Sequence, residues 1–323
     1  MPVKSRILVC AALCLAAVAG CRARDASIVS MAKRAPWKTP QGEGVRLTTK
    51  HYDIYTTVKD PRMQAYFPGF MEAAYLNYLS LTGLRPRRPA KPMPIYMMAT
   101  REQWADLTRR RLKEQAGPYL SIQAGGYCHD GVCVFWQLTG RKALSVASHE
   151  GLHQLFHHRL RHHLPMWLEE GLCTVAEGHH VAGQAVRFTP DRNLFRFENL
   201  RTAIINGQWI PLRRLLHMDA GEAIEDPRKS PVGYYGQVWA LARLLRSNKR
   251  YAAGVRRMLA DAEAGTFHKP LKVPRRALAE LQLRARAYNR TISEPLFKHY
   301  ISKDLEGFER EYKAYARKIT KLE

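Results

Sequence analysis

The chain has 323 residues, enough for one large domain or two lobes around a buried core. Its composition, with 46% hydrophobic and 25% charged residues and no low-complexity tract, is that of an ordinary globular protein. Lysine and arginine outnumber aspartate and glutamate by 52 to 28, a net charge of +24 that favours anionic surroundings. The basic residues are scattered and no nucleic-acid-binding motif is present, so we expect a solvated basic surface and no nucleic-acid partner.

The N-terminus has the features of an export signal. Lys4 and Arg6 precede an apolar run at 7–19, which is too short for a membrane-spanning helix but suits the apolar region of a signal peptide. The run ends in small residues just before Cys21. The sequence therefore predicts a signal peptide at 1–20.

The end of this signal, Val18-Ala19-Gly20-Cys21, resembles the lipobox of bacterial lipoproteins. The resemblance implies that Cys21 is lipidated, becomes the first mature residue and anchors the protein in the cell envelope through several acyl chains. Arg22 stands where an aspartate often retains such proteins in an inner membrane, so we expect the outer membrane or the cell surface. The alternative is an ordinary secretory signal with an incidental cysteine.

Residues 21–45 are predicted to be a tether between the anchor and the folded domain. They lack hydrophobic periodicity and hold several glycine, proline and charged residues. We expect a single folded domain at 46–323.

The first part of this domain alternates strand and helix patterns. HYDIYTTV at 51–58 predicts a strand, helical spacing predicts a helix at 60–81, and the run MPIYMMA predicts a second strand. Thr100 with Gln103 resembles a capping box that opens the helix REQWADLTRRRL. These elements predict an α/β lobe at 46–142 with a small mixed or antiparallel sheet.

The segment GGYCHDGVCVFW predicts a β-hairpin with its turn between Cys128 and Cys133. Residues that flank such a turn face each other at distances that a disulfide can bridge, and an exported protein meets an oxidising compartment. We therefore expect a disulfide between Cys128 and Cys133, with two small buried thiols as the alternative. Cys173 is expected to be a core thiol.

The second part of the domain, 143–323, is predicted to be a mainly helical lobe. A helix rich in histidine begins it, and Pro165 is expected in the first turn of the next helix. The fold class is therefore α+β, a sheet lobe followed by a helical lobe, with the histidine helix at their junction. Helices are expected at 143–161, 210–217, 232–247, 251–264 and 275–288, and over the C-terminal segment DLEGFEREYKAYARKI.

Six histidines lie in the stretch 148–172, SHEGLHQLFHHRLRHHLPMWLEEGL, and helical geometry separates them. His149 and His153 are about 40° apart around the helix axis and about 6 Å apart along it, so their imidazoles can converge on one ion. Glu150 lies between them, where it can hold a water beside that ion. This is the H-E-x-x-H arrangement of zinc hydrolases.

A second pair four residues apart, His158 and His162, is excluded on chemistry. Arg159 and Arg161 would place positive charge beside the ion, and no carboxylate takes the role of Glu150. His157 could act only indirectly. We expect the remaining histidines to be exposed, cationic or adventitious metal binders outside the metal site: His157, His158, His162, His163, His179 and His180.

A third ligand is expected from the next helix, which contains PMWLEEGL. Two imidazoles and one carboxylate would leave the fourth zinc position for water. Sequence register alone does not separate Glu169 from Glu170.

The combination H-E-x-x-H-Q with P-x-W-L-x-E-G-L resembles the gluzincin metallopeptidases, closest to the peptidase MA-like, DUF1570-type exported bacterial proteins. The resemblance is strongest at 143–177 and 231–242 and covers most of the chain from about residue 52. It implies a zincin-like fold and one zinc ion per chain, with Glu170 as the third ligand. It also implies that Tyr235, in YYGQVWAL, donates to the transition state; the alternative is an interface aromatic.

Two features need explanation within this resemblance. Gly151 inside the motif helix costs about 1 kcal/mol relative to alanine. Glu177, seven residues after Glu170, either orients a histidine from outside the ligand set or is a surface residue.

The sequence thus favours a lipid-anchored zinc metallopeptidase that hydrolyses peptide bonds in the envelope or outside the cell, as a monomer. In this hypothesis His149, His153 and Glu170 hold zinc and Glu150 is the general base. One alternative is a non-catalytic surface or scaffold lipoprotein with the same fold. Another is a zinc hydrolase of a non-peptide amide bond.

Overall fold

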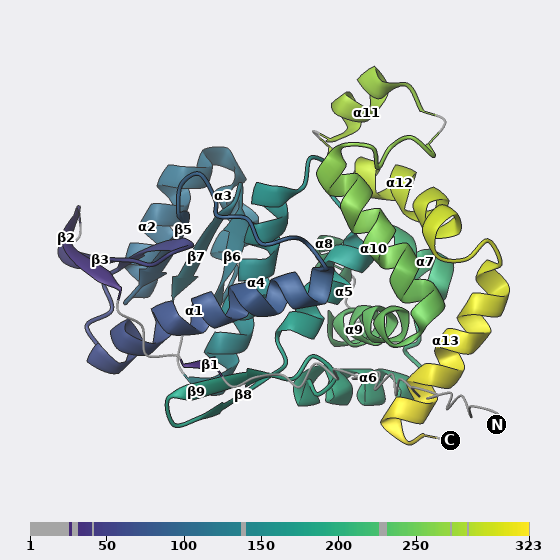
Figure 1. The fold of residues 1–323 in the computed structure, drawn as a ribbon, viewed down its shortest axis with the longest axis horizontal. Coiled ribbons are helices and arrows are strands. Elements are labelled where there is room, and N and C mark those ends of the chain that lie inside the picture. The colour runs from purple at the N-terminus through teal and green to yellow at the C-terminus, as the bar shows by residue number, and fades with distance from the viewer. Residues whose placement is uncertain are drawn as a thin grey trace, which may run out of the picture.

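The structure, a computed structural model, describes residues 26–27, 32–40, 42–136, 140–225, 231–271, 273–282 and 284–322. An N-terminal sheet lobe is followed by a helical lobe (Figure 1), so the predicted α+β class is confirmed. None of the described helices is both long and apolar enough to cross a membrane.

The sheet of the first lobe is mixed, as predicted. Its strand order is β2-β3-β4-β5-β7-β6, with β4–β5 and β5–β7 parallel and the other pairs antiparallel. The β6–β7 hairpin is the predicted one, with both turn residues, Asp130 and Gly131, at positive φ. The strands are β2 (Lys33–Thr39), β3 (Gly42–Thr48), β4 (Tyr52–Thr56), β5 (Met93–Met98), β6 (Gly125–His129) and β7 (Val132–Trp136).

The predicted tether at 21–45 is wrong from Lys33 on, because β2 and β3 extend the sheet there. β2 is an edge strand with mostly exposed side chains, so its sequence has no apolar alternation to reveal it. The backbone ladder to β3 and the packing of Trp37 against Tyr55, with ring centroids 5.4 Å apart, hold it instead. The signal peptide at 1–20 and Cys21 lie outside the described residues.

Helices cover both faces of the sheet. α1 (Pro61–Thr82), with Asp60 as its N-cap, connects β4 to β5 and packs with α4 on one face. α2 (Arg101–Leu112), capped by Thr100 as predicted, packs on the other face with η1 (Lys113–Gln115) and α3 (Ala116–Leu120). The alternation of β7 divides these cores, since Phe135 belongs to the first and Val134 to the second.

The histidine helix α4 (Gly140–Arg159) lies between the lobes in Figure 1 and contacts α1, β6 and α5. Gly151 is explained by this packing. A Cβ at Gly151 would lie 2.5 Å from Tyr78 Oη and 2.8 Å from Met71 Cε, both on α1. The close approach of α1 therefore requires glycine and outweighs its low helix propensity.

The helical lobe continues with α5 (Met166–Ala176), whose N-cap is Pro165. A three-stranded sheet of β1 (Ala26–Ser27), β9 (Ala185–Phe188) and β8 (His179–Ala182) lies below α1. The later helices are α6 (Leu194–Ile205), α7 (Leu212–His217), α8 (Ala220–Glu225), α9 (Pro231–Ser247), α10 (Lys249–Ala264), α11 (Arg275–Gln282), α12 (Ala285–Tyr300) and α13 (Leu305–Thr320).

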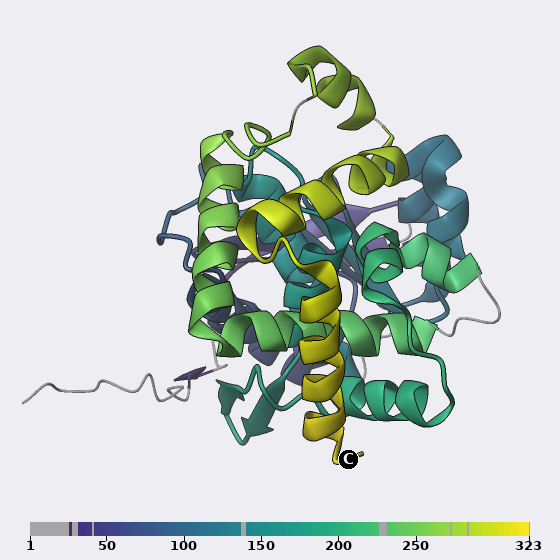
Figure 2. The same ribbon diagram turned by 90° about the vertical axis from the view of Figure 1, so that its right-hand side faces the viewer.

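Two differences from the predicted helices are informative. The single helix expected at 275–288 is two, because Arg284, at φ −123° and ψ 77°, is not helical. α6 was not expected, and it contributes to the functional site. The amphipathic α13, yellow in Figure 2, closes the chain over the outside of this lobe as predicted.

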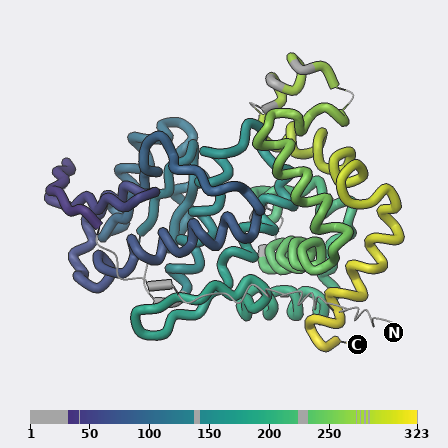
Figure 3. The backbone as a smooth tube through the Cα atoms, in the orientation of Figure 1, coloured from purple at the N-terminus to yellow at the C-terminus, as the bar shows by residue number. Residues whose placement is uncertain are grey.

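The connection from α1 to β5, residues 83–92, has no regular structure. It returns along the C-terminal half of α4 to the start of β5 (Figure 3). Hydrogen bonds hold it along its length, among them one from Tyr75 Oη to the Arg87 carbonyl at 2.7 Å and one from the Met93 amide to the His51 carbonyl at 2.7 Å.

Candidate metal centre

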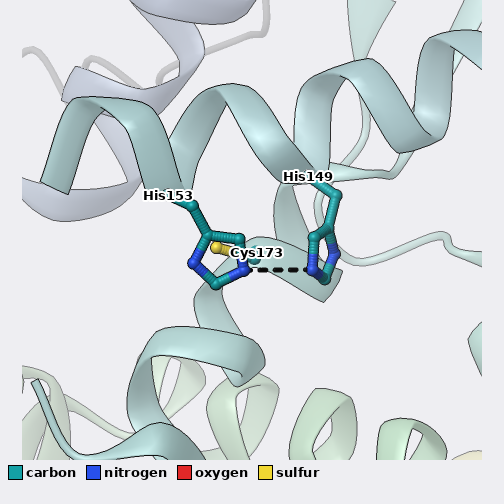
Figure 4. Close-up of side chains that lie close together, drawn as sticks. All are labelled: His149, His153 and Cys173. Carbon is teal, nitrogen blue, oxygen red and sulfur yellow. Dashed lines mark hydrogen bonds between the residues drawn. The ribbon is translucent and has the colours of Figure 1, made fainter. Parts of the chain in front are cut away.

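His149 and His153 project from the same side of α4 toward α5 (Figure 4). Their Nε2 atoms are 3.2 Å apart, which is the convergence that the four-residue spacing predicts. Both rings are largely buried, with His149 8% exposed.

Glu170 on α5 is the carboxylate that meets this pair. Its Oε2 lies 3.2 Å from His149 Nε2, and its Oε1 lies 3.7 Å from His153 Nε2. Glu169 instead contacts the far side of the His153 ring, so the tertiary structure separates the two glutamates that register left open.

Cys173, one turn after Glu170, also lies beside the pair. One ligand atom from each of His149, His153 and Cys173 falls within 4.8 Å of the others, and the thiol lies behind the His153 ring in Figure 4. It is a buried core thiol, as predicted, and it is a second donor that could compete with Glu170.

The geometry of His149, His153 and Glu170 fits a zinc ion. Nitrogen and oxygen ligands at about 2.0–2.2 Å with tetrahedral angles lie about 3.4 Å from each other. The 3.2 Å between the two Nε2 atoms and the 3.2 Å from His149 Nε2 to Glu170 Oε2 are close to that value, and the other oxygen of Glu170 lies 3.7 Å from His153 Nε2. Moreover, Glu170 Oε2 is buried 3.2 Å from His149 Nε2 without the alignment of a hydrogen bond, an arrangement that suits two ligands of a shared cation.

The opposite nitrogens of the two rings are held by carboxylates. His149 Nδ1 is 2.8 Å from Glu177 Oε1, and His153 Nδ1 is 2.8 Å from Glu169 Oε1. In a neutral ring each Nδ1 then donates its proton, which leaves both Nε2 lone pairs free for a metal. Of the two readings of Glu177, the structure supports the orienting carboxylate, since it is buried and not on the surface.

Glu177 is itself fixed by two residues of the α6 region that the sequence did not indicate. Arg196 donates to both its oxygens, at 2.8 and 2.6 Å, and Asn193 Nδ2 donates to Oε2 at 2.8 Å. Asn193 also caps α6 by accepting from the Arg196 amide. A cap signal at Asn193 could have placed the helix, but nothing in sequence spacing ties it to the metal centre.

The electrostatics favour positive charge at the two imidazoles. Burial lowers the pKa of His149, but Glu170 and Glu177 outweigh burial and raise it to about 9. The pKa of His153 is also raised well above its ordinary value, despite burial, by its acidic neighbours Cys173, Glu170 and Glu169. The pKa of Glu170 is lowered against the effect of burial by both histidines. A cluster of two imidazoles and neighbouring carboxylates binds protons or, in their place, a divalent cation.

Glu150 lies on the sheet side of the pair. Burial raises the pKa of its carboxyl, and the attraction of His149 and His153 opposes that rise. The backbone amide of Cys128, on the edge strand β6, donates a hydrogen bond to the carboxylate. A carboxylate with a raised pKa, held beside two metal-facing imidazoles, is suited to accept a proton.

Tyr235, on α9, lies on the other side of His149. Its ring centroid is 6.3 Å from that of His149, and the Arg196 guanidinium lies 4.8 Å above its ring. Burial raises the pKa of its hydroxyl, which keeps the proton available for donation. The tyrosine thus lies at the centre, held by the same arginine that fixes Glu177.

The other histidines are elsewhere. His157 and His158 are exposed at the end of α4, and His158 Nε2 bonds the Gly131 carbonyl at 3.0 Å. His162 is partly buried against His268, with ring centroids 3.9 Å apart, and His179 against Phe70, with ring centroids 5.2 Å apart, so the expected exposure is wrong for these two residues. Within the described ranges, the group that includes His149 and His153 is the one cluster of histidine, cysteine and acidic side chains close enough to share a metal.

The disulfide predicted between Cys128 and Cys133 is not present, although the two are directly opposite in the β6–β7 register. Both are free thiols. The Cys133 thiol is buried and contacts the Glu150 carbonyl, 3.3 Å away. Cys133 therefore packs against the histidine helix α4, and no disulfide joins the two strands of the hairpin.

The chain matches no protein-family model, and no curated protein sequence is detectably similar to it.

Proposed function

We propose that the protein is a zinc-dependent metallopeptidase of the gluzincin type. The observation that carries the proposal is the convergence of His149 Nε2, His153 Nε2 and Glu170 at separations of 3.2 to 3.7 Å, with Glu150 beside them. Zinc held by these three ligands would polarise a substrate carbonyl and lower the pKa of a bound water.

The residues of the chain have distinct roles in this proposal. Glu150 accepts a proton from the attacking water and returns it to the leaving amine, so that a C–O bond forms as the peptide C–N bond breaks. Tyr235 donates a hydrogen bond to the carbonyl oxygen as negative charge develops on it. Glu177 and Glu169 keep the two imidazoles in the tautomer and orientation that ligation requires.

The export signal and the lipobox-like VAGC extend the proposal to place and partner. The protein is anchored through lipidated Cys21 on the outer membrane or cell surface, where it hydrolyses peptide or protein substrates as a monomer.

The test compares wild type with Glu150→Gln in zinc content and in cleavage of a peptide library. Glu150→Gln is expected to keep one zinc per chain and to lose about 10²- to 10⁴-fold in cleavage rate, because only the proton acceptor is removed. Glu198→Gln, the same change at an exposed position on α6, serves as the control and should match wild type.

Retention of cleavage by Glu150→Gln would refute the assigned base. Zinc binding without cleavage of any peptide by wild type would favour the non-catalytic lipoprotein. Cleavage of cell-wall amides but not of peptides would favour a hydrolase of another amide bond.

A further inference from the structure

A cavity of about 750 Å³ lies between the 83–92 connection and the C-terminal end of α4. Its size is in the range of small-molecule sites and is larger than a bare inorganic anion needs. Its wall combines cations with apolar and aromatic side chains, among them Arg87, Lys91, Arg159, Tyr55, Met93 and Leu155.

The cavity has excess positive charge. Arg87, Arg88 and Lys91 line it and have no ion-pair partner among the residues that the structure describes. The one lining carboxylate, Asp53, is already neutralised by Arg46 at 2.5 Å and accepts from Thr48 at 2.6 Å.

Arg159 is the buried cation of this wall, with its side chain only 8% exposed. Its Nε donates to Glu263 at 3.1 Å, and Nη2 contacts the same oxygen. Its Nη1 has no acceptor within the described part of the chain. Since buried guanidinium groups normally satisfy all their donors, this arginine is short of one acceptor.

The connection that carries the exposed cations is stiffened. Its sequence, RPRRPAKPMP, has a proline at every second or third position, which limits the conformations that binding must fix. The bond from Tyr75 to the Arg87 carbonyl holds it at its middle, and the bond from Met93 to His51 holds it where β5 begins. The cationic rim is therefore ordered before any ligand arrives.

We propose that this cavity binds a phosphate-bearing organic anion. Arginine matches phosphate oxygens with paired N–H donors, and the phosphate would meet Arg87, Arg88 and Lys91 at the rim. The rest of the ligand would lie against the apolar part of the wall, where Tyr55, Pro92 and Pro94 are partly exposed. The same chemistry describes a phosphorylated small molecule and an anionic lipid headgroup.

The cavity is separate from the metal centre, so the proposal does not rest on the proposed peptidase activity. At about 100° per residue, Leu155 and His158 point about 140° and about 160° away from the mean direction of His149 and His153, and Arg159 points about 100° away from it. If a phosphate binds at the metal centre instead, its binding should be lost in His153→Ala, which leaves the cavity unchanged.

The experiment measures calorimetric binding of glucose 6-phosphate and inorganic phosphate to the full chain. It also measures cosedimentation with phosphatidylcholine vesicles with and without phosphatidylglycerol. The test variant is Arg87→Ala/Arg88→Ala/Lys91→Ala. The control, Lys303→Ala/Arg310→Ala/Lys318→Ala, removes the same charge from exposed positions around α13.

We expect saturable binding of glucose 6-phosphate or of the anionic vesicles, weakened about tenfold or more in the test variant and less than about twofold in the control. Binding should persist in His153→Ala, which removes a metal ligand. Preference for the sugar phosphate identifies a soluble ligand, and preference for the vesicles identifies a lipid headgroup.

Three results would overturn the proposal. These are equal losses in test variant and control, loss of binding in His153→Ala alone, or no saturable binding of any probe. Because the triple variant alters only exposed side chains of a connection, its thermal unfolding should match wild type. Arg159→Lys, which keeps the charge but loses paired donors, should weaken binding in the same direction.

Discussion

Four glutamates gather around His149 and His153 in a chain whose net charge is +24. Glu170 faces the space between the rings, Glu177 and Glu169 each hold one Nδ1, and Glu150 lies beside them. This concentration of negative charge offsets the basic surroundings locally. It is the physical basis on which a divalent cation can be held in so basic a protein.

At the scale of single residues, the proposal that Glu170 is the third zinc ligand can be tested directly. Glu170→Gln is expected to reduce zinc affinity by more than the roughly 10- to 100-fold typical of residues outside the ligand set. Cys173→Ser should retain the zinc of wild type, because the oxygens of Glu170 lie 3.2 and 3.7 Å from the two Nε2 atoms and the carboxylate alone would complete the three ligands. Metal content and competition titration with a chelator measure both, and the opposite pattern would make Cys173 the third ligand.

The orienting role of Glu177 gives a second prediction. Glu177→Gln should weaken zinc affinity about 10- to 100-fold, because a neutral amide holds His149 Nδ1 less strongly and leaves Arg196 without its carboxylate. Chelator competition measures the affinity, and circular dichroism of the metal-free protein checks that the variant is folded. Unchanged affinity in a folded variant would mean that Glu177 serves only to pair Arg196.

At the scale of elements, α5 presents two different faces. Glu169 and Glu170 face the metal centre, and Gly171 faces α9, where a Cβ would lie 2.8 Å from the Val238 carbonyl oxygen and 2.9 Å from Ala242 Cβ. Because the Val238 oxygen belongs to the backbone of α9, it cannot move aside as a flexible side chain could. The position of Glu170 therefore depends on how closely α5 can approach α9.

Gly171→Ala is expected to lower the free energy of unfolding by about 1–3 kcal/mol despite the better helix propensity of alanine, because it overpacks this contact. Thermal and denaturant unfolding measure the change. Gly117→Ala is the matched control in α3, where nothing lies within 4 Å of the added Cβ, and it should be neutral or slightly stabilising. Equal effects of the two substitutions would show that the α5–α9 approach is looser than the structure indicates.

At the scale of the whole molecule, the two lobes share one hydrophobic core. Buried residues of α1, the sheet, α4, α5 and the later helices form a continuous cluster, and α4 lies in it with its histidines at the junction. The candidate metal centre takes its groups from both lobes, since Glu150 receives a hydrogen bond from β6 and Glu177 is fixed by the α6 region. Only a chain folded as one unit assembles it.

The proposed anchor is tested on the full chain expressed in a bacterial host. Cys21→Ser should move the protein from the membrane fraction to the soluble exported fraction and abolish labelling with radioactive palmitate, because the acylated side chain is lost. Cys14→Ser, within the predicted signal peptide, is the control and should stay membrane-bound and labelled. A labelled, membrane-bound Cys21→Ser protein would refute the lipobox interpretation.

Local patterns predicted many of the elements. The cap at Thr100, the hairpin turn at Asp130-Gly131 and the apolar periodicity of α4 depend on neighbours within a few residues, so they can be predicted from the sequence. The edge strand β2 and its neighbour β3 were missed because their pairing is made by backbone groups and leaves no side-chain pattern. The break between α11 and α12 at Arg284 was also missed, because the helical spacing of apolar residues continues across it.

The sequence by itself determined the pair of imidazoles and the glutamate between them, because a helix places residues i, i+1 and i+4 at fixed angles whatever surrounds it. Only the tertiary structure decided which of Glu169 and Glu170 faces the pair, and that Glu177, Arg196 and Asn193 support it. It likewise brought the cations of the 83–92 connection to the far side of the same helix. These relations depend on how separate elements pack, and that packing is set by the whole core and not by any short stretch of the chain.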